Sequence, residues 1–456
     1  MTRTTQNLRS SLARKLKGLA CSSLVTMLVA GSGLAGSESA LASGQAKPMA
    51  IRGEKAVSLL QPTATTFFGC ESRAFAGLRL FCYGPAAMRA AYGVDKLIAK
   101  GYDGTGQTIV IVDAYGSPTM AADLAAFSTK FGLPPADITE IRLGAPFDPT
   151  DANQLGWAEE TSLDVQWSHA IAPGAKIILI AAASNNDPDL LAAQDYAINH
   201  HLGGTISESY GESETALYAD PTGAGLTILA NDEASYARAR AKGIAVFVSS
   251  GDSGSFEQDY LGNPIIGALY PGSSPNVTSV GGTNLYFGTL GAATPNGQYL
   301  TESVWNDGYG AGGGGVSGYF ATPSFQTKNL PASTLSVLGG YRGYPDVTYN
   351  AGVVGGVLVY LGFLGPGTET FYIFGGTSSG APQWAAIASD LGSAKGEPIG
   401  NINNRLYKKQ GFAAHDIVAG QNGFNGFQGY IAAPAFDLSS GWGSPTFDLL
   451  KQLISD

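Results

Sequence analysis

Apolar runs of strand length alternate with helix-length segments from about Ala86 onward, and this alternation constrains the fold more than any other feature. The strand candidates are apolar almost throughout, as strands buried on both faces are, and lie at 107–115, 175–183, 204–211 and 244–252. Helix candidates lie between them at 157–170, 187–201 and 230–242, and a further helix begins near Ser379. The pattern predicts an α/β fold with a mostly parallel central sheet flanked by helices, in a single catalytic domain over residues 86–456.

Residues 1–42 have the composition of a secretory signal peptide. Five basic residues between positions 3 and 17 precede an apolar stretch from Gly18 to Ala35, and Ala40-Leu41-Ala42 offers a small-residue cleavage site. Cys21 lies at the start of that stretch rather than at its end, which argues against a lipid anchor. We therefore expect a secreted, extracellular protein, with the periplasm as the alternative compartment. No later run of about 20 apolar residues follows, so we expect no membrane contact in the mature form.

Residues 43–85 form an N-terminal extension or a short pro-segment. Cys70 and Cys82 are the two cysteines beyond the signal peptide, and in an exported chain such a pair indicates one disulfide that closes a short loop.

Charged residues are scarce, at 14% of the chain compared with roughly 25% in an average soluble domain, and the net charge is −10. The charge of this acidic chain gives no indication of nucleic-acid binding. Acid unfolding comes mostly from protonating carboxylates that are paired in the native state, so a chain with few ion pairs tolerates low pH. A Gly-rich, neutral secreted protein explains the composition equally well.

The segment FGGTSSGAPQWAAI at 374–387 contains the candidate nucleophile. Gly375 and Gly376 allow a close approach of the backbone, and Ser378 then stands where a helix begins. Pro382 is tolerated in the first helical turn, and the helix dipole favours negative charge nearby. Ser379 is the alternative nucleophile, although it fits the Gly-Thr-Ser frame less well.

No histidine is an obvious general base for such a serine. The chain has four histidines, and the one near a motif, His169, is more simply a packed or surface residue. Glu160 and Asp164 are better candidates, because they lie four residues apart on one face of a helix, where sharing a proton relieves their repulsion. Such a pair usually lies on a solvated helix face, but the neighbouring apolar residues at 157, 163 and 167 favour burial here.

Two further acids follow predicted strands, at the sheet edge where active sites collect. Asp252 lies in FVSSGDSG at 247–254, and a turn-forming aspartate is the equal alternative there. Asp113 follows the first strand, where a subtilisin-type neutral protease would use it.

Three of these motifs together resemble the sedolisin family of serine-carboxyl peptidases, acid-acting relatives of the subtilisins. They are Glu160-x-x-x-Asp164, Ser-Gly-Asp252-Ser-Gly and Gly-Thr-Ser378-Ser-Gly-Ala-Pro382. The resemblance covers about residues 83–456 and includes GGGVS at 313–317, Gln326 and the run Arg342-Gly-x-Pro-Asp-Val.

This resemblance implies a subtilisin-like fold and a serine-type endopeptidase that acts on proteins or peptides, as a monomer. It makes Ser378 the nucleophile, Glu160 its general base, Asp164 the residue that orients Glu160, and Asp252 the oxyanion partner. At pH 4 only roughly 0.3% of an imidazole is unprotonated, whereas roughly a third of an unperturbed glutamate is ionised. Because Asp252 must be protonated to donate to the oxyanion, we expect activity confined to acid.

The resemblance also implies one structural calcium ion near the C-terminus. Asp416 and Asp437 supply carboxylates, and Ile417, Ala433 and Ala435 supply backbone oxygens. The last two positions are usually glycine in the family. Family members also commonly carry a large N-terminal prodomain, and only about 40 residues separate Ala42 from the region of similarity.

Two other functions remain open from sequence. A subtilisin-type neutral protease would share the serine motif but would lack an imidazole base. An inactive, secreted calcium-binding protein on the same fold would keep the motifs without the geometry. The preferred peptide bond and the choice between endopeptidase and exopeptidase action are not readable from the chain.

Overall fold

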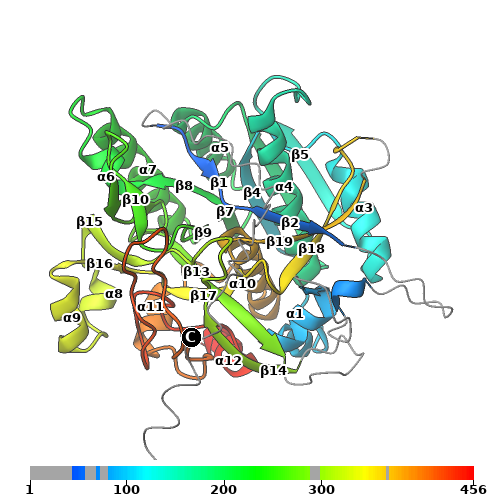
Figure 1. Cartoon of the computed structure of the whole chain (residues 1–456). Coiled ribbons are helices and arrows are strands. Elements are labelled where there is room, and N and C mark those ends of the chain that lie inside the picture. Colours follow the sequence, from blue (N-terminus) through cyan, green and yellow to red (C-terminus); the bar gives the residue numbers. More distant parts are fainter. Residues whose placement is uncertain (1–43, 57–67, 72–80, 288–297, 366–368, 456) are drawn as a thin grey trace, which may run out of the picture. The chain divides into compact units, whose positions relative to one another are not determined.

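A largely parallel sheet of eight strands forms the centre of the protein in the computed structural model, which describes residues 44–56, 68–71, 81–287, 298–365 and 369–455 (Figure 1). The expected signal peptide lies outside the described residues. Seven strands run parallel to their neighbours: β5 (Asp137–Arg142), β6 (Lys176–Ala182), β4 (Thr108–Ala114), β7 (Thr205–Glu208), β9 (Ala245–Ser249), β13 (Thr278–Phe287) and β17 (Val347–Asn350). The eighth, β14 (Tyr299–Val304), pairs antiparallel with β13. The predicted fold class is confirmed.

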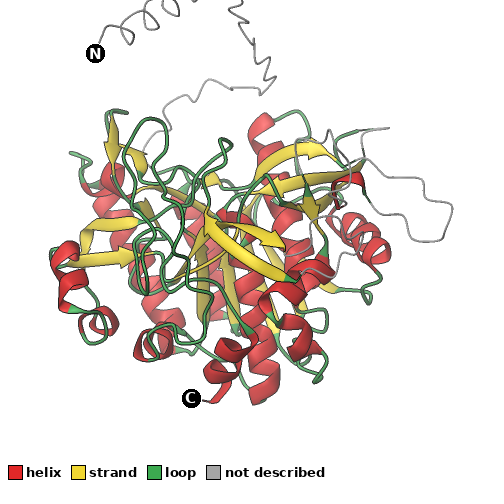
Figure 2. Cartoon of the chain, turned by 60° about the horizontal axis from the view of Figure 1, so that its bottom comes forward, coloured by secondary structure: helices red, strands yellow, loops and turns green. Residues whose placement is uncertain are grey.

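Residues of β4 alternate between two hydrophobic cores, because successive side chains of a strand point to opposite faces. Ile109 and Ile111 pack in one core, with side chains of α3 (Met120–Phe131), α4 (Ala152–Ile171) and α10 (Ala381–Lys395). Val110 and Val112 pack in the other, with α5 (Asp187–Asn199) and α7 (Ala224–Ala241). Helices therefore cover both faces of the sheet, as Figure 2 shows.

The predicted run at 204–211 is two strands rather than one. The chain leaves the central sheet after β7, and β8 (Tyr210–Ser213) enters a small antiparallel sheet between β1 (Lys47–Pro48) and β12 (Leu269–Tyr270). A second small sheet has the order β2 (Ile51–Lys55), β19 (Thr370–Gly375), β18 (Gly356–Leu361) and β3 (Cys82–Tyr83). The described strands before position 86, β1, β2 and β3, are thus part of the small sheets of the domain.

The remaining described elements are short or peripheral. They are η1 (Gly69–Glu71), α1 (Pro85–Tyr92), α2 (Val94–Ile98), α6 (Glu214–Tyr218), β10 (Phe256–Gln258), β11 (Pro264–Ile266), β15 (Gly315–Ala321), α8 (Ser324–Thr327), α9 (Ala332–Leu338), β16 (Tyr341–Tyr344), η2 (Thr377–Ser379), α11 (Asn403–Lys408) and α12 (Phe447–Ser455). The predicted disulfide between Cys70 and Cys82 is present and joins η1 to β3. Among the described helices, none combines the length and apolar character needed to cross a membrane.

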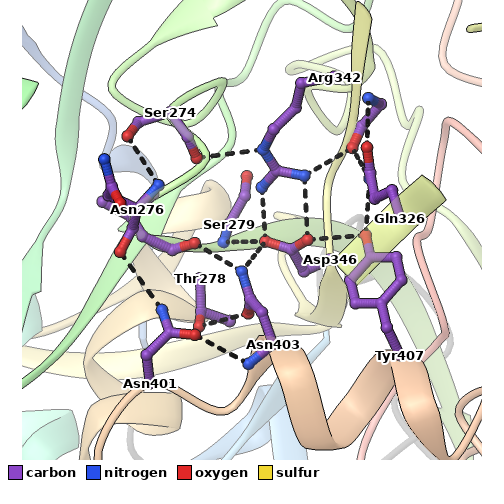
Figure 3. A network of polar contacts seen from close by, with 12 residues as sticks. Ser274, Asn276, Thr278, Ser279, Gln326, Arg342, Asp346, Asn401, Asn403 and Tyr407 are labelled. Carbon is purple, nitrogen blue, oxygen red and sulfur yellow. Dashed lines mark hydrogen bonds and ion pairs between the residues drawn. The ribbon is translucent and has the colours of Figure 1, made fainter. Parts of the chain in front are cut away.

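A fully buried ion pair connects the C-terminal part of the chain to the sheet (Figure 3). The Arg342 guanidinium donates two hydrogen bonds to the Asp346 carboxylate, at 2.7 and 3.1 Å. Asp346 also accepts from the Ser279 amide of β13 at 2.9 Å and from the Tyr407 hydroxyl of α11 at 2.8 Å. Gln326 donates to Tyr407 at 2.9 Å. The Arg342-Gly-x-Pro-Asp run and Gln326 therefore have a structural role.

We expect Asp346→Ala to lower the free energy of unfolding by about 3–5 kcal/mol, because it leaves the guanidinium buried without its countercharge. Urea unfolding at a fixed pH measures the change. The matched control is Asp448→Ala, which breaks the exposed 2.8 Å pair with Lys451 and should leave stability nearly unchanged. Equal effects of the two substitutions would contradict the structural role of the buried pair.

Candidate active site

Ser378 lies in the short helix η2, between the end of β19 and the start of α10, and is fully buried. Gly376 before it has φ 101°, a conformation that favours glycine. A side-chain carbon at Gly376 would also lie 2.1 Å from the Met49 carbonyl oxygen and 2.6 Å from Asp252 Oδ2. The close backbone approach predicted for this turn is thus present, and it brings Ser378 beside two other chain segments.

Glu160 and Asp164 are both fully buried on α4, as the neighbouring apolar residues suggested. Glu160 Oε2 accepts a 2.6 Å hydrogen bond from the Ala50 amide, and Asp164 Oδ1 accepts a 3.0 Å bond from the Ser209 hydroxyl. The Ser378 hydroxyl donates to the Ser209 carbonyl oxygen at 3.5 Å. Ser209, which follows β7, therefore links the serine to the acidic pair.

The second oxygen of Glu160, Oε1, is buried and has no partner at normal hydrogen-bond distance among the described residues. The Ser378 hydroxyl is nevertheless near enough to favour the charged form of Glu160 and to lower its pKa. We interpret this as a loose contact in the resting site, which shortens when the serine donates its proton, since such bonds are often long before substrate reacts.

Three buried carboxyl groups share this region. Burial raises the pKa of Glu160 well above its usual value, and the charges of Asp113 and Asp252 add to the effect. Burial likewise raises the pKa of Asp164, with further contributions from Asp113 and Glu160. The charge of Asp113 thus adds to the effect of burial on both helix carboxyls.

From the sequence, Asp113 was given a role only in the alternative function, a neutral protease. It stands near the end of β4, fully buried, and burial raises its pKa to about 7, while the nearby Thr161 hydroxyl lowers it. In the sequence, its position at the carboxyl end of a central strand was the signal for an active-site role. The signal did not show that β4 ends beside α4.

Asp252 follows β9 and is also placed at the site. Its Oδ1 accepts from the Thr377 amide at 2.7 Å and from the Thr377 hydroxyl at 2.8 Å, so Oδ2 is left buried without a partner among the described residues. Burial raises the pKa of Asp252 to about 7; the Thr377 bonds oppose this rise, and the charge of Asp307 adds to it. Below that pH, Oδ2 carries a proton that it can donate.

The chain's own residues 44–56 cross the site. Lys47–Pro48 pairs antiparallel with Tyr210–Gly211, and the Met49 amide donates to the Ser209 carbonyl at 3.2 Å. Beyond Ala50, strand β2 pairs antiparallel with β19, which leads into Ser378. The Arg52 guanidinium also forms a 2.6 Å ion pair with Glu159 of α4. The Met49–Ala50 peptide unit consequently lies against Glu160 on one side and beside Asp252 on the other.

The histidines lie elsewhere, as expected. His169 is buried in α4, where Nε2 contacts the Pro134 carbonyl at 2.9 Å, and His415 stacks on Tyr299. His200 and His201 follow the last residue of α5. No imidazole in the described part of the chain hydrogen-bonds to Ser378, Glu160 or Asp164.

The five predicted calcium ligands meet in one C-terminal loop, but their carboxylates are turned toward backbone amides. Asp416 Oδ2 accepts from Ala435 at 3.0 Å, and Asp437 Oδ2 accepts from Ala433 at 2.9 Å. Ile417, the residue after Asp416, is buried, and the backbone of Ala435 has φ 64°. No cluster of three or more His, Cys, Asp or Glu side chains within the described ranges could hold a metal ion. A cation here would therefore depend on two carboxylates and on carbonyl oxygens.

Comparison with known proteins agrees with this geometry. The chain is 34% identical to Kumamolisin of Bacillus sp. (strain MN-32) over 363 residues, or 78% of this chain and 61% of the relative. It is 30% identical to Sedolisin of Pseudomonas sp. (strain 101) over 354 residues, or 74% of this chain and 56% of the relative. No protein-family model matches the chain.

A solved structure of Pseudomonas sedolisin, a serine-carboxyl proteinase complexed with pseudo-iodotyrostatin, matches with a TM-score of 0.69 and 28% identity, covering 83% of this chain and 98% of that one. A subtilisin-like fold with a buried serine among carboxyl groups defines the serine-carboxyl class. The chain belongs to the sedolisin family. The matched region spans a little over half the length of these two curated relatives.

We expect Asp252→Asn to extend activity to higher pH. The wild-type carboxyl loses its proton as the pH rises through about 7 and then repels a developing oxyanion, whereas an amide donates at every pH. The measurement is kcat/KM against pH from 3 to 9 for both proteins. An unchanged alkaline limb would show that Asp252 only supports the turn.

Proposed function

We propose that this protein is an exported, acid-acting serine endopeptidase that hydrolyses protein or peptide substrates through Ser378 and the carboxyl groups around it, as a monomer. The observation that carries the proposal is the placement of the Met49–Ala50 peptide bond. Its amide nitrogen donates to Glu160, its carbonyl oxygen lies beside Asp252 Oδ2, and the preceding amide pairs with Ser209.

The chemistry follows from these positions. Ser378 Oγ attacks the carbonyl carbon of the scissile bond while its proton passes to Glu160, which Asp164 and Ser209 hold in place. The protonated Asp252 donates to the oxygen that becomes negative. Collapse of this intermediate breaks the C–N bond, and Glu160 returns the proton to the departing nitrogen, leaving an acyl-enzyme on Ser378. Water then attacks the ester, with Glu160 again as the base.

The runner-up functions have less support. A neutral, subtilisin-type mechanism needs an imidazole beside the serine, and the described histidines are engaged elsewhere. An inactive calcium-binding protein would not need a peptide bond whose amide donates to a buried glutamate and whose carbonyl oxygen lies beside a buried aspartate. The proposal of endopeptidase action is supported by contacts that continue back to Gly44, which hydrogen-bonds to Glu212 at 3.2 Å, well beyond three residues ahead of the bond. A tripeptidyl peptidase would need only three.

Residues 44–56 act in this proposal as a pro-segment. The segment fills the groove like a substrate, with β1 on one side of the bond and β2 on the other, and blocks other peptides until the Met49–Ala50 bond is cut. In this proposal the described residues 44–56 thereby restrain activity before cleavage.

Acidification of the full chain tests both statements. We expect wild type to acquire Ala50 as its new N-terminus at about pH 4, detected by mass spectrometry, and then to degrade a denatured protein between pH 2 and the neutral range. Ser378→Ala should retain the uncut segment, and Glu160→Gln should be at least about a hundredfold slower, as expected on losing a general base. Cleavage of denatured protein by Ser378→Ala would refute the proposed nucleophile. Cleavage at other bonds alone would refute the pro-segment.

We also propose that a calcium ion stabilises the loop at 416–437, because Asp416 and Asp437 lie near one another through Ala433 and Ala435, and carbonyl oxygens adjoin them. A bound ion stabilises only the folded state, so chelation with EDTA should lower the melting temperature by several degrees, and Ca²⁺ should restore it. In Asp437→Asn the chelator should have little effect. A wild-type melting temperature that is indifferent to EDTA and to added Ca²⁺ would exclude the ion.

A further inference from the structure

One asparagine in the connection between β6 and α5 binds both backbone polar groups of Ala46. The Ala46 amide donates to the Asn185 carbonyl oxygen at 3.0 Å, and the Asn185 side-chain amide donates to the Ala46 carbonyl oxygen at 2.9 Å. Asn185 is only 5% exposed, so these hydrogen bonds are largely shielded from water. No side-chain atom of Ala46 takes part in them.

The residues after Asn185 continue the contact toward the start of the described segment. The Asp187 amide donates to the Gly44 carbonyl at 3.1 Å, and Gln45 forms an antiparallel bridge with Asn186. On the opposite edge, Lys47–Pro48 pairs with β8, and the Met49 amide donates to the Ser209 carbonyl. Residues 44–49 therefore lie as an extended strand between β8 and residues 185–187.

The orientation of the Asn185 side chain is fixed from behind. Its Oδ1 accepts from the Tyr115 hydroxyl at 2.9 Å and from Asn153 Nδ2 at 3.2 Å. Because donors occupy the oxygen, the nitrogen is the atom that faces Ala46. Tyr115 follows β4, and Asn153 lies in the first turn of α4, the helix that also carries Glu160. The elements that build the acidic site therefore also hold this amide in place.

The register makes Ala46 the fourth residue before the Met49–Ala50 bond. A peptide cut three residues from its own N-terminus would begin at the position of Lys47 and would have no fourth residue to offer. The Asn185 amide would then lose its acceptor, and a buried donor left without a partner costs free energy. The contact thus distinguishes substrates by the length of chain ahead of the bond, and it is indifferent to the side chain at that position.

We propose that Asn185 is a substrate-binding residue that recognises the backbone of the fourth residue before the scissile bond, and that it selects interior bonds of polypeptides over bonds three residues from an N-terminus. The inference rests on the proposed peptidase function and names the class of substrate. Residues 44–46 of the chain show the path that such a substrate follows, with β8 on one edge and residues 185–187 on the other.

Two peptides of different length test the selection. GQAKPMAIRG copies residues 44–53, and KPMAIRG lacks the first three residues, so both release the same product, AIRG, which mass spectrometry quantifies. We measure kcat/KM for the full chain at pH 4. The long peptide should exceed the short one by at least about tenfold, since two hydrogen bonds to the fourth residue are lost from the short one.

A variant and a modified peptide assign the effect to Asn185. Asn185→Ala should reduce the ratio of the long to the short peptide by at least about threefold, whereas a general folding defect would lower both rates alike. Asn199→Ala removes the same kind of side chain at the exposed last residue of α5 and should leave the ratio unchanged. With the wild type, N-methylalanine at the position of Ala46 removes the donor to the Asn185 carbonyl and should slow cleavage at least about threefold.

The outcomes separate this inference from the proposed function. Equal rates for the two peptides, or a faster short peptide, would overturn the selection for length while the peptidase function stands. An unchanged ratio in Asn185→Ala, or an N-methylated peptide cut as fast as its parent, would overturn the role of Asn185. Failure to cut either peptide would remove the peptidase function, and this inference with it.

Discussion

Burial of carboxyl groups without a compensating cation is the constraint on which the active centre depends. Asp113, Glu160 and Asp164 are fully buried, and each pKa is raised chiefly because the surroundings exclude water. Groups whose pKa is raised on folding favour the native state below their unfolded pKa of about 4, and this contribution is lost as the pH rises through the folded values. In the proposed function, this burial therefore favours the native state at the acid pH at which the protein would work.

Helix α4 makes this burial possible. One part of its surface packs against the hydrophobic core that covers the sheet, and from there it carries Glu160 and Asp164 to the carboxyl ends of β4 and β7. The turn after β19 brings Ser378 to the same point, and the loop after β9 adds Asp252. Each group comes from a different part of the chain, but all of them lie at one edge of a parallel sheet, where strand ends converge.

In the proposed function, residues 44–56 extend this arrangement from catalysis to control. Lys47–Pro48 pairs with β8 and β2 pairs with β19, so under that proposal this segment follows the path of a substrate. Regulation and substrate recognition then use the same backbone hydrogen bonds.

The sequence by itself determined the layered α/β class, the disulfide between Cys70 and Cys82, and the candidates Ser378, Glu160, Asp164 and Asp252, because strand and helix periodicity and short motifs are local properties. It did not reveal that the run at 204–211 divides at Ser209, that the charge of Asp113 acts on Glu160 and Asp164, or that residues 44–56 pair with β8 and β19 beside Glu160. Those features depend on contacts between segments that are distant in the sequence, such as Ala50 with Glu160. Only the packing of the sheet and α4 decided which acids are desolvated, and desolvation rather than residue identity raises their pKa values.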